Sequence, residues 1–267
     1  MNRNQITKQQ YVIWRKCRGL YPVLFSDNAR KNATKEYEQA VEQAKLLHQQ
    51  QEELKKIMLD SRDEDEPQQE MFVPPGALKA PLIFLLHGAG WNGGSQIEIW
   101  RAIAEREKIV LFAPTSLGEE RDWLHPQDQK HIADKLQYAT RILPIDAKRV
   151  YVVGHSRGGL RALRIARMNP EKIAAVGLHS PTEDHGVLHG VFPKSPRQLP
   201  VRVWAGSNHE EDCNRTWAEL LPYHFNEQPE HHLDVDVKLL DHHRHGDYNT
   251  RDGLLDEIWE FLKDKSL

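Results

Sequence analysis

A serine within a glycine-rich hexapeptide is the clearest candidate for chemistry in this sequence. Ser156 lies within residues 154–159 (GHSRGG), directly after the apolar run 149–153 and before the helical pattern 160–168. A strand that turns sharply into a helix imposes strained backbone angles on the residue between them, and small neighbours let the two elements approach closely. The pattern therefore predicts a nucleophile elbow, in which the Ser156 hydroxyl is exposed at a helix N-terminus.

Histidines and carboxylates further along the chain could supply the other groups that such a serine needs. A serine hydroxyl is a weak nucleophile until a base removes its proton. Residues 241–248 read DHHRHGDY and offer His242, His243 and His245 as candidate bases. Residues 206–212 read GSNHEED and offer carboxylates that could orient the base.

These candidate residues follow the strands of an α/β alternation. Apolar segments of strand length alternate with segments of helical periodicity over the last two hundred residues. Continuous apolar strands separated by helices indicate a mostly parallel sheet with helices on both faces. The expected strands are 71–73, 82–86, 109–113, 149–153, 173–178, 201–205 and 233–240, and the expected helices are 98–107, 131–142, 160–168, 217–221 and 251–263.

The sequence of these segments resembles the α/β-hydrolase superfamily. Residues 81–90 (PLIFLLHGAG) resemble its third strand and oxyanion loop, and residues 109–114 resemble its next strand. Residues 149–159 (RVYVVGHSRGG) resemble its nucleophile elbow. The resemblance covers residues 67–267 and is strongest to small esterases without a lid, the feruloyl-esterase, polyhydroxybutyrate-depolymerase and phospholipase/carboxylesterase groups. It implies a serine hydrolase of the α/β-hydrolase fold that needs no cofactor and no metal.

The resemblance also implies where the base lies. Members of the family place the serine, the acid and the histidine in that order along the chain, with the histidine a few residues past the last strand. The family's histidine commonly precedes a small residue, and Gly246 follows His245. His245 is therefore the expected base, while His242 and His243 are expected to be solvated or secondary.

The acid is harder to assign, because the sequence departs here from the family pattern. The family often places the acid three residues past a glycine in the loop after the sixth strand, and His209 occupies that position. Glu210 lies nearest, and its extra methylene could compensate for the shift, so Glu210 is the predicted acid. Asp212, Glu211 and Asp184 remain alternatives, and Asp212 could instead cap the following helix.

Two backbone N–H groups must face the negative oxygen that develops on a substrate carbonyl. By the resemblance, these groups belong to Ala89, in the loop after the second expected strand, and to Arg157, the residue after the serine. Gly88 and Gly90 flank Ala89 and leave room for the backbone to approach an acyl group.

Composition and charge argue against several classes of protein. The chain has 267 residues and a formal net charge of −3 at pH 7, so no basic field favours nucleic acid. No apolar run approaches the ~18 residues of a membrane span, and residues 1–10 lack the apolar segment of a signal peptide. Cys17 and Cys213 are the only cysteines, which favours a reducing, cytoplasmic setting over a disulfide framework.

Residues 1–66 differ from the rest and are expected to form a helical extension. Segment 28–60 lacks Gly and Pro, and a heptad-like seam runs from Tyr37 to Met58 with Gln51 as its one polar intrusion. The acidic run 60–67 ends in proline and is typical of a solvated linker. The seam suits either a coiled coil that forms a homodimer or a long amphipathic helix lying on its own domain.

Together these features predict a cytoplasmic serine hydrolase that cleaves a carboxylic ester or thioester of a small molecule through an acyl-enzyme. A serine peptidase with the same triad is one alternative. A non-catalytic, hydrolase-fold interaction protein that works through segment 28–60 is another. The histidine at position 209 keeps this last interpretation open, whereas Ser156 and His245 argue against it.

Overall fold

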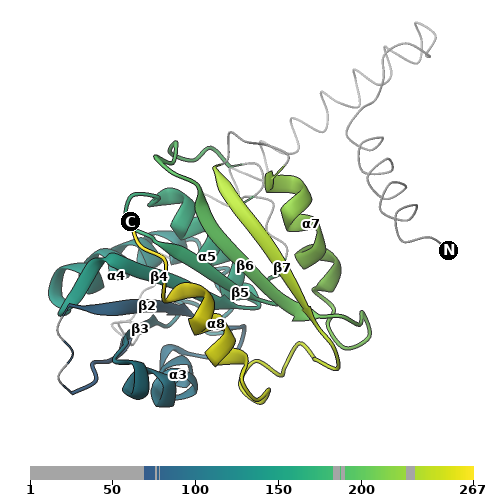
Figure 1. The fold of residues 1–267 in the computed structure, drawn as a ribbon, viewed down its shortest axis with the longest axis horizontal. Coiled ribbons are helices and arrows are strands. Elements are labelled where there is room, and N and C mark those ends of the chain that lie inside the picture. Colours follow the sequence, from purple (N-terminus) through teal and green to yellow (C-terminus); the bar gives the residue numbers. More distant parts are fainter. Residues whose placement is uncertain (1–68, 76, 78, 183–186, 188–189, 227–231) are drawn as a thin grey trace, which may run out of the picture. The chain divides into compact units, whose positions relative to one another are not determined.

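The fold of the protein is given by a computed structural model (Figure 1). It describes residues 69–75, 77, 79–182, 187, 190–226 and 232–267. The expectations for residues 1–66, including the helix at 28–60 and the homodimer it could form, lie outside the described residues.

A seven-stranded sheet carries the candidate site (Figure 1). Its strand order is β1-β3-β2-β4-β5-β6-β7, and every neighbouring pair is parallel except β1 with β3. The predicted mostly parallel sheet is therefore confirmed. The strands are β1 (Gln69–Phe72), β2 (Ala80–Leu86), β3 (Val110–Pro114), β4 (Ile145–His155), β5 (Ala175–His179), β6 (Leu199–Gly206) and β7 (Leu233–Leu240).

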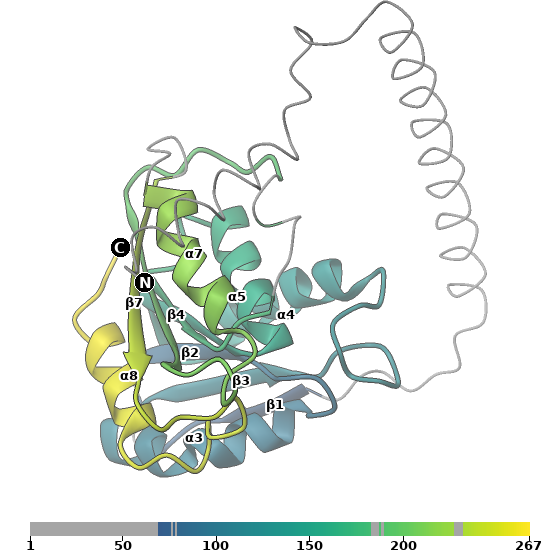
Figure 2. The ribbon, with the colours of Figure 1, turned by 90° about the vertical axis from the view of Figure 1, so that its right-hand side faces the viewer.

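Helices cover both faces of the sheet (Figure 2). Helices α3 (Gly93–Glu107) and α8 (Leu254–Leu262) lie on one face, and α4 (Asp128–Ile142), α5 (Arg157–Met168) and α7 (Arg215–Asn226) lie on the other. None of the helices in the described part of the chain is both long and apolar enough to span a bilayer.

Burial on both faces explains why the central strands are continuous apolar runs. All seven residues of β2 are buried. Leu82, Phe84 and Leu86 pack into the core beneath α4, α5 and α7, whereas Ile83 and Leu85 pack into the core beneath α3 and α8. Alternate side chains of one strand therefore contribute to two separate cores.

Two elements begin at least four residues earlier than the apolar pattern predicts. Helix α3 begins at Gly93 rather than at residue 98, because Asn92 caps it. The Asn92 side chain accepts a hydrogen bond from the Ser95 backbone at 2.8 Å, and the Ser95 hydroxyl accepts one from the Asn92 backbone at 3.2 Å. Strand β4 begins at Ile145 rather than at residue 149, and its added residues are half-buried or exposed.

Candidate active site

The turn between β4 and α5 has the backbone of a nucleophile elbow. Ser156 has φ 53° and ψ −120°, a left-handed region that residues with a side chain rarely adopt. Its N–H donates to the carbonyl of His179 at 2.9 Å. Its own carbonyl accepts from the N–H groups of Gly159 at 2.9 Å and Thr182 at 3.1 Å. These bonds hold the strained residue in place at the N-terminus of α5.

Glycines make the elbow sterically possible. A Cβ added to Gly154 would lie 2.3 Å from the carbonyl oxygen of Gly158, and one added to Gly158 would lie 2.3 Å from that of Leu86. On the neighbouring loop, a Cβ on Gly88 would lie 3.4 Å from Cβ of Ser156. The serine is therefore held where three backbone segments meet in close contact.

The structure brings His245 to the serine. Nε2 of His245 lies 3.0 Å from Oγ of Ser156, within hydrogen-bond reach. His245 comes from the loop after β7, and its backbone N–H donates to the carbonyl of Glu211 at 3.0 Å. Of the two other candidate bases, His242 is exposed and His243 is fully buried, and neither is hydrogen-bonded to Ser156 in the described structure.

At the other ring nitrogen of His245 the structure places Asp212, and not Glu210. Oδ1 of Asp212 lies 3.5 Å from Nδ1 of His245. Glu210 is exposed, and its backbone N–H donates to the side chain of Asn208 at 3.0 Å. We therefore correct the assignment of Glu210, since its carboxylate makes no contact with His245 among the described residues.

The fold of the loop explains this correction. The carbonyl of Asn208 accepts from the N–H groups of Glu211 at 3.2 Å and Asp212 at 2.9 Å, which closes a tight turn. The turn brings Asp212 back beneath His245 and leaves Glu210 on its outer side. Of the remaining alternatives, Glu211 meets His245 through its backbone carbonyl, and Asp184 lies outside the described residues.

Asp212 is a buried carboxylate with a full set of partners. Oδ2 accepts from the hydroxyl of Ser180 at 2.5 Å and from the N–H of Gly206 at 2.9 Å. Oδ1 accepts from the N–H of Asn214 at 3.0 Å and faces His245. Burial alone would raise the pKa of Asp212, but the hydrogen bonds with His245, Ser180 and the two backbone groups outweigh it and hold that pKa well below its usual range. The carboxylate is therefore ionised.

Two backbone N–H groups at the site are available to a ligand. Among the described residues, neither Ala89 N–H nor Arg157 N–H donates to another backbone group, although Gly90 N–H beside them donates to the carbonyl of Arg121 at 3.2 Å. Ala89 is exposed, and Arg157 is the first residue of α5. The Arg157 guanidinium lies 3.8 Å from the carboxylate of Asp122, so the side chain pairs within the protein.

A comparison with protein families agrees with this arrangement. A family model described as "alpha/beta hydrolase fold" matches residues 81–266. The chain belongs to the α/β-hydrolase family. No match appears among curated proteins.

Solved structures share the fold of this α/β-hydrolase at low sequence identity. A carboxylesterase from Bacillus cereus is 15% identical, with a TM-score of 0.56 over 74% of this chain and 94% of its own. An S-formylglutathione hydrolase from Agrobacterium tumefaciens is 18% identical, with a TM-score of 0.55 over 73% and 88%. Est1E from Butyrivibrio proteoclasticus, solved with ferulic acid bound, is 13% identical, with a TM-score of 0.55 over 74% and 94%.

Beneath the site of this α/β-hydrolase lies a chain of three buried histidines, of which only His243 was a candidate from the sequence. Nδ1 of His155 lies 2.8 Å from Nδ1 of His179, and Nε2 of His179 lies 2.7 Å from Nε2 of His243. Tyr248 stacks on the His155 ring with 4.8 Å between centroids and 3° between planes. Burial lowers the pKa of His155 to about 3 and that of His179 well below its usual range, so both rings are neutral.

The register of the sheet explains this chain of histidines. His155 and His179 are the last residues of the neighbouring parallel strands β4 and β5, where they pair directly. His243 comes from the loop after β7 and is also fully buried. The signal in the sequence was a histidine-serine pair at the end of each strand, but reading it requires knowing that the two strands are neighbours.

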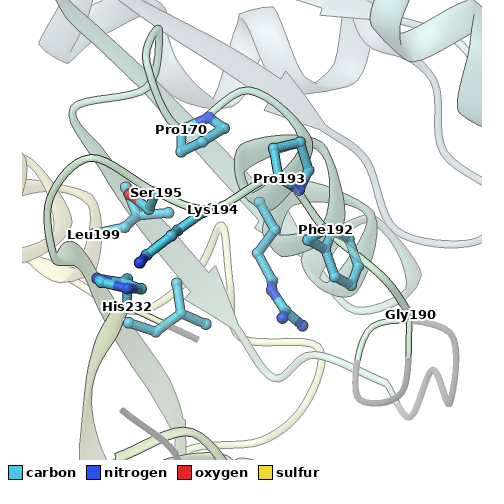
Figure 3. A pocket seen from close by; sticks show the side chains of 10 residues that line it. Pro170, Gly190, Phe192, Pro193, Lys194, Ser195, Leu199 and His232 are labelled. Carbon is cyan, nitrogen blue, oxygen red and sulfur yellow. The ribbon is translucent and has the colours of Figure 1, made fainter. Parts of the chain in front are cut away.

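A cavity of about 470 Å³ lies at the opposite end of the sheet (Figure 3). Its lining includes Leu199 and Leu233, the first residues of β6 and β7. Because Ser156 follows the carboxyl end of β4, the cavity is separated from it by the length of the parallel strands. Lys194 and His232 also line the cavity, and no predicted site residue does.

Proposed function

We propose that this protein is a serine hydrolase that cleaves carboxylic esters or thioesters of small molecules through an acyl-enzyme intermediate. The observation that carries the proposal is the 3.0 Å separation between Ser156 Oγ and His245 Nε2, with the buried Asp212 carboxylate at the other ring nitrogen. A nucleophile, a base and an orienting group in one line are what acyl transfer requires.

In the first half of the reaction, Ser156 Oγ attacks the carbonyl carbon while its proton passes to Nε2 of His245. The ionised Asp212 stabilises the imidazolium that forms. The carbonyl oxygen becomes negative, and the N–H groups of Ala89 and Arg157 are the proposed donors to it. His245 then gives its proton to the leaving alcohol or thiol, and the acyl group stays on Ser156.

The second half repeats these steps with water. His245 takes a proton from the water molecule, whose oxygen attacks the acyl carbon. The tetrahedral intermediate collapses, Ser156 recovers its proton from His245, and the acid product leaves. Catalysis of both halves needs the same three side chains, so loss of one removes most of the rate.

The family and the structural neighbours support a hydrolase, and several of those neighbours carry the names of esterases. For this reason we propose an ester or thioester, rather than an amide, as the bond that is cleaved. Cytoplasmic location and a homodimer through segment 28–60 stay predictions from the sequence.

The test combines covalent labelling with one substitution. A fluorophosphonate probe should label the full-length protein once, and Ser156→Ala should abolish the labelling. The same variant should lose hydrolysis of p-nitrophenyl esters on the order of 10³-fold or more. A panel of esters of increasing acyl length with matched amides identifies the preferred bond and acyl chain.

Ser207→Ala is the matched control for this test. Ser207 directly follows β6, and its hydroxyl donates to Asp241 at 2.7 Å rather than to a residue of the proposed triad. This variant should keep both labelling and turnover. A folded Ser156→Ala protein that still turns over esters would refute the serine-hydrolase proposal, and faster cleavage of amides than of esters would turn it into a peptidase.

A further inference from the structure

Three potential metal ligands of different chemistry meet at one side of the triad. One ligand atom each from Asp212, Cys213 and His245 lie within 4.8 Å of one another. Asp212 is buried, His245 is partly exposed and Cys213 is exposed, so the group opens to solvent through the thiol. A thiolate, an imidazole and a carboxylate together favour a borderline or soft divalent cation such as Zn²⁺ over Mg²⁺ or Ca²⁺.

The separations suit a tetrahedral ion. Ligands that bind Zn²⁺ at roughly 2.0–2.3 Å lie about 3.3–3.6 Å apart in a tetrahedron. Nδ1 of His245 and Oδ1 of Asp212 are 3.5 Å apart, which matches one edge with no movement. Within the described residues, the one hydrogen bond of the Cys213 thiol goes to Asn214 Oδ1 at 3.7 Å, so the side chain can turn toward an ion without losing a strong partner.

The charges and lone pairs also suit an ion. A carboxylate has about four lone-pair sites, and the hydrogen bonds from Ser180, Gly206 and Asn214 occupy three of those of Asp212. The fourth, on Oδ1, faces Nδ1 of His245, and an ion between these two atoms would replace the contact that joins them. The Asp212 carboxylate and a Cys213 thiolate together balance a divalent charge beside a neutral His245.

The side chain of Asn214 also lies beside Nδ1 of His245. The Asn214 side-chain nitrogen donates to the carbonyl of Ser180 at 2.8 Å, which fixes the orientation of the amide. The same nitrogen lies 3.4 Å from Nδ1 of His245. Asn214 and Asp212 therefore both face Nδ1, the atom of His245 that an ion would bind.

We propose that Asp212, Cys213 and His245 form an inhibitory site for a thiophilic divalent cation, with Zn²⁺ as its natural representative. A neutral imidazole carries a single N–H proton. When the metal displaces the proton that Nδ1 shares with Asp212, this proton passes through solvent to Nε2, the nitrogen that has to accept the proton of Ser156 in catalysis. The metal therefore removes the general base while leaving the 3.0 Å contact between His245 and Ser156 in place.

Metal binding itself is measured without substrate, so that it stays separate from the proposed function on which the inhibition rests. Cd²⁺ is titrated into the reduced full-length chain, and the ultraviolet charge-transfer band of a cadmium thiolate is recorded. Cys17→Ser, which removes the other cysteine of the chain, should keep the band. Cys213→Ser and Cys213→Ala should lose it, and Mg²⁺ or Ca²⁺ should not displace Cd²⁺.

Inhibition is measured as the esterase rate in Zn²⁺ divided by the rate of the same protein in EDTA. The wild type and Cys17→Ser should lose most of their activity. Both Cys213 variants should need Zn²⁺ concentrations about 10-fold higher or more, since loss of even an outer group that orients a ligand weakens metal binding ~10–100-fold.

The two measurements separate the ways in which the proposal can fail. A cadmium band that persists in both Cys213 variants, or equal Zn²⁺ sensitivity of all four proteins, would overturn the site. Inhibition by Mg²⁺ at the same concentration as Zn²⁺ would overturn its chemistry. If Ser156→Ala remained active, the proposed function would fail, and the cadmium titration would still report on the site.

Discussion

The nucleophile elbow and the acid loop position Ser156 and Asp212, two members of the proposed triad, by different means. At the elbow, backbone atoms and absent side chains set the position, since Gly154 and Gly158 have no room for a Cβ. At the acid loop, side-chain hydrogen bonds set the position, since Asp212 is held by Ser180 and two backbone N–H groups. The need for small residues at the elbow can be recognised in a short stretch of sequence. The hydrogen bonds that hold Asp212 can be recognised only once the loop is folded.

The largest expected effect tests which carboxylate the acid loop supplies. Asp212→Asn should lower kcat by about 10⁴-fold, because a neutral amide cannot stabilise the imidazolium or hold its tautomer. Glu210→Gln is the matched control and should change kcat little, because Glu210 is exposed and makes no contact with His245 among the described residues. Both are measured as steady-state ester hydrolysis on proteins of verified fold.

The reverse pattern would return the acid role to Glu210. Little change in either variant would point to a serine-histidine pair that works without an acid, or to Asp184. Either result would break the distinction between the two regions, because the hydrogen bonds around Asp212 would then be structural only.

The next effect tests the steric rule at the elbow. Gly158→Ala should lower the free energy of unfolding by about 1–3 kcal/mol or more, because the new Cβ would lie 2.3 Å from the carbonyl of Leu86. Gly246→Ala should change it by less than about 0.5 kcal/mol, because nothing lies within 4 Å of that Cβ. Urea unfolding followed by fluorescence measures both, and equal losses would show that the elbow is not sterically tight.

The smallest effect is a difference in how the buried histidines and Asp212 make the free energy of unfolding depend on pH. Burial lowers the pKa of His87 to about 4 and that of His155 to about 3, against 6.5 for an ordinary histidine. Both are neutral when folded and take up protons on unfolding below pH 6.5. Their contribution to stability is therefore complete above pH 6.5 and is lost as the pH falls toward 4, at about 1.4 kcal/mol per pH unit for each histidine.

Asp212 has the opposite behaviour in the same experiment. Its pKa is lowered on folding, so its contribution is present above its unfolded pKa of about 3.9 and is lost only at lower pH. Between pH 6.5 and 4.5, His87→Asn should lower the slope of the unfolding free energy against pH by up to about 1.4 kcal/mol per pH unit, the contribution of one proton. Asp212→Asn should leave this slope unchanged. A slope that His87→Asn does not alter would contradict the assignment of a neutral, buried His87.

Much of the fold followed from the sequence because burial on both faces leaves a plain apolar signal. The seven strands and five helices of the described residues lie where the pattern predicts, although α3 and β4 begin earlier and α7 ends later than expected. Ser156 and His245 also meet as expected. Asp212 was only an alternative to Glu210, because its position beside His245 depends on the turn at Asn208, which the sequence does not show.

The buried histidines leave one consequence for the chemistry at the elbow. Each neutral ring has one N–H and one lone pair, so His179 can donate toward His155 only if it accepts from His243, and the reverse. Nδ1 of His243 has no hydrogen-bond partner in the described structure that would fix this choice. The three rings therefore have two possible sets of tautomers, and they change from one set to the other together. The tautomer of His243 decides whether Nε2 of His155, beside Gly88, carries a proton or a lone pair.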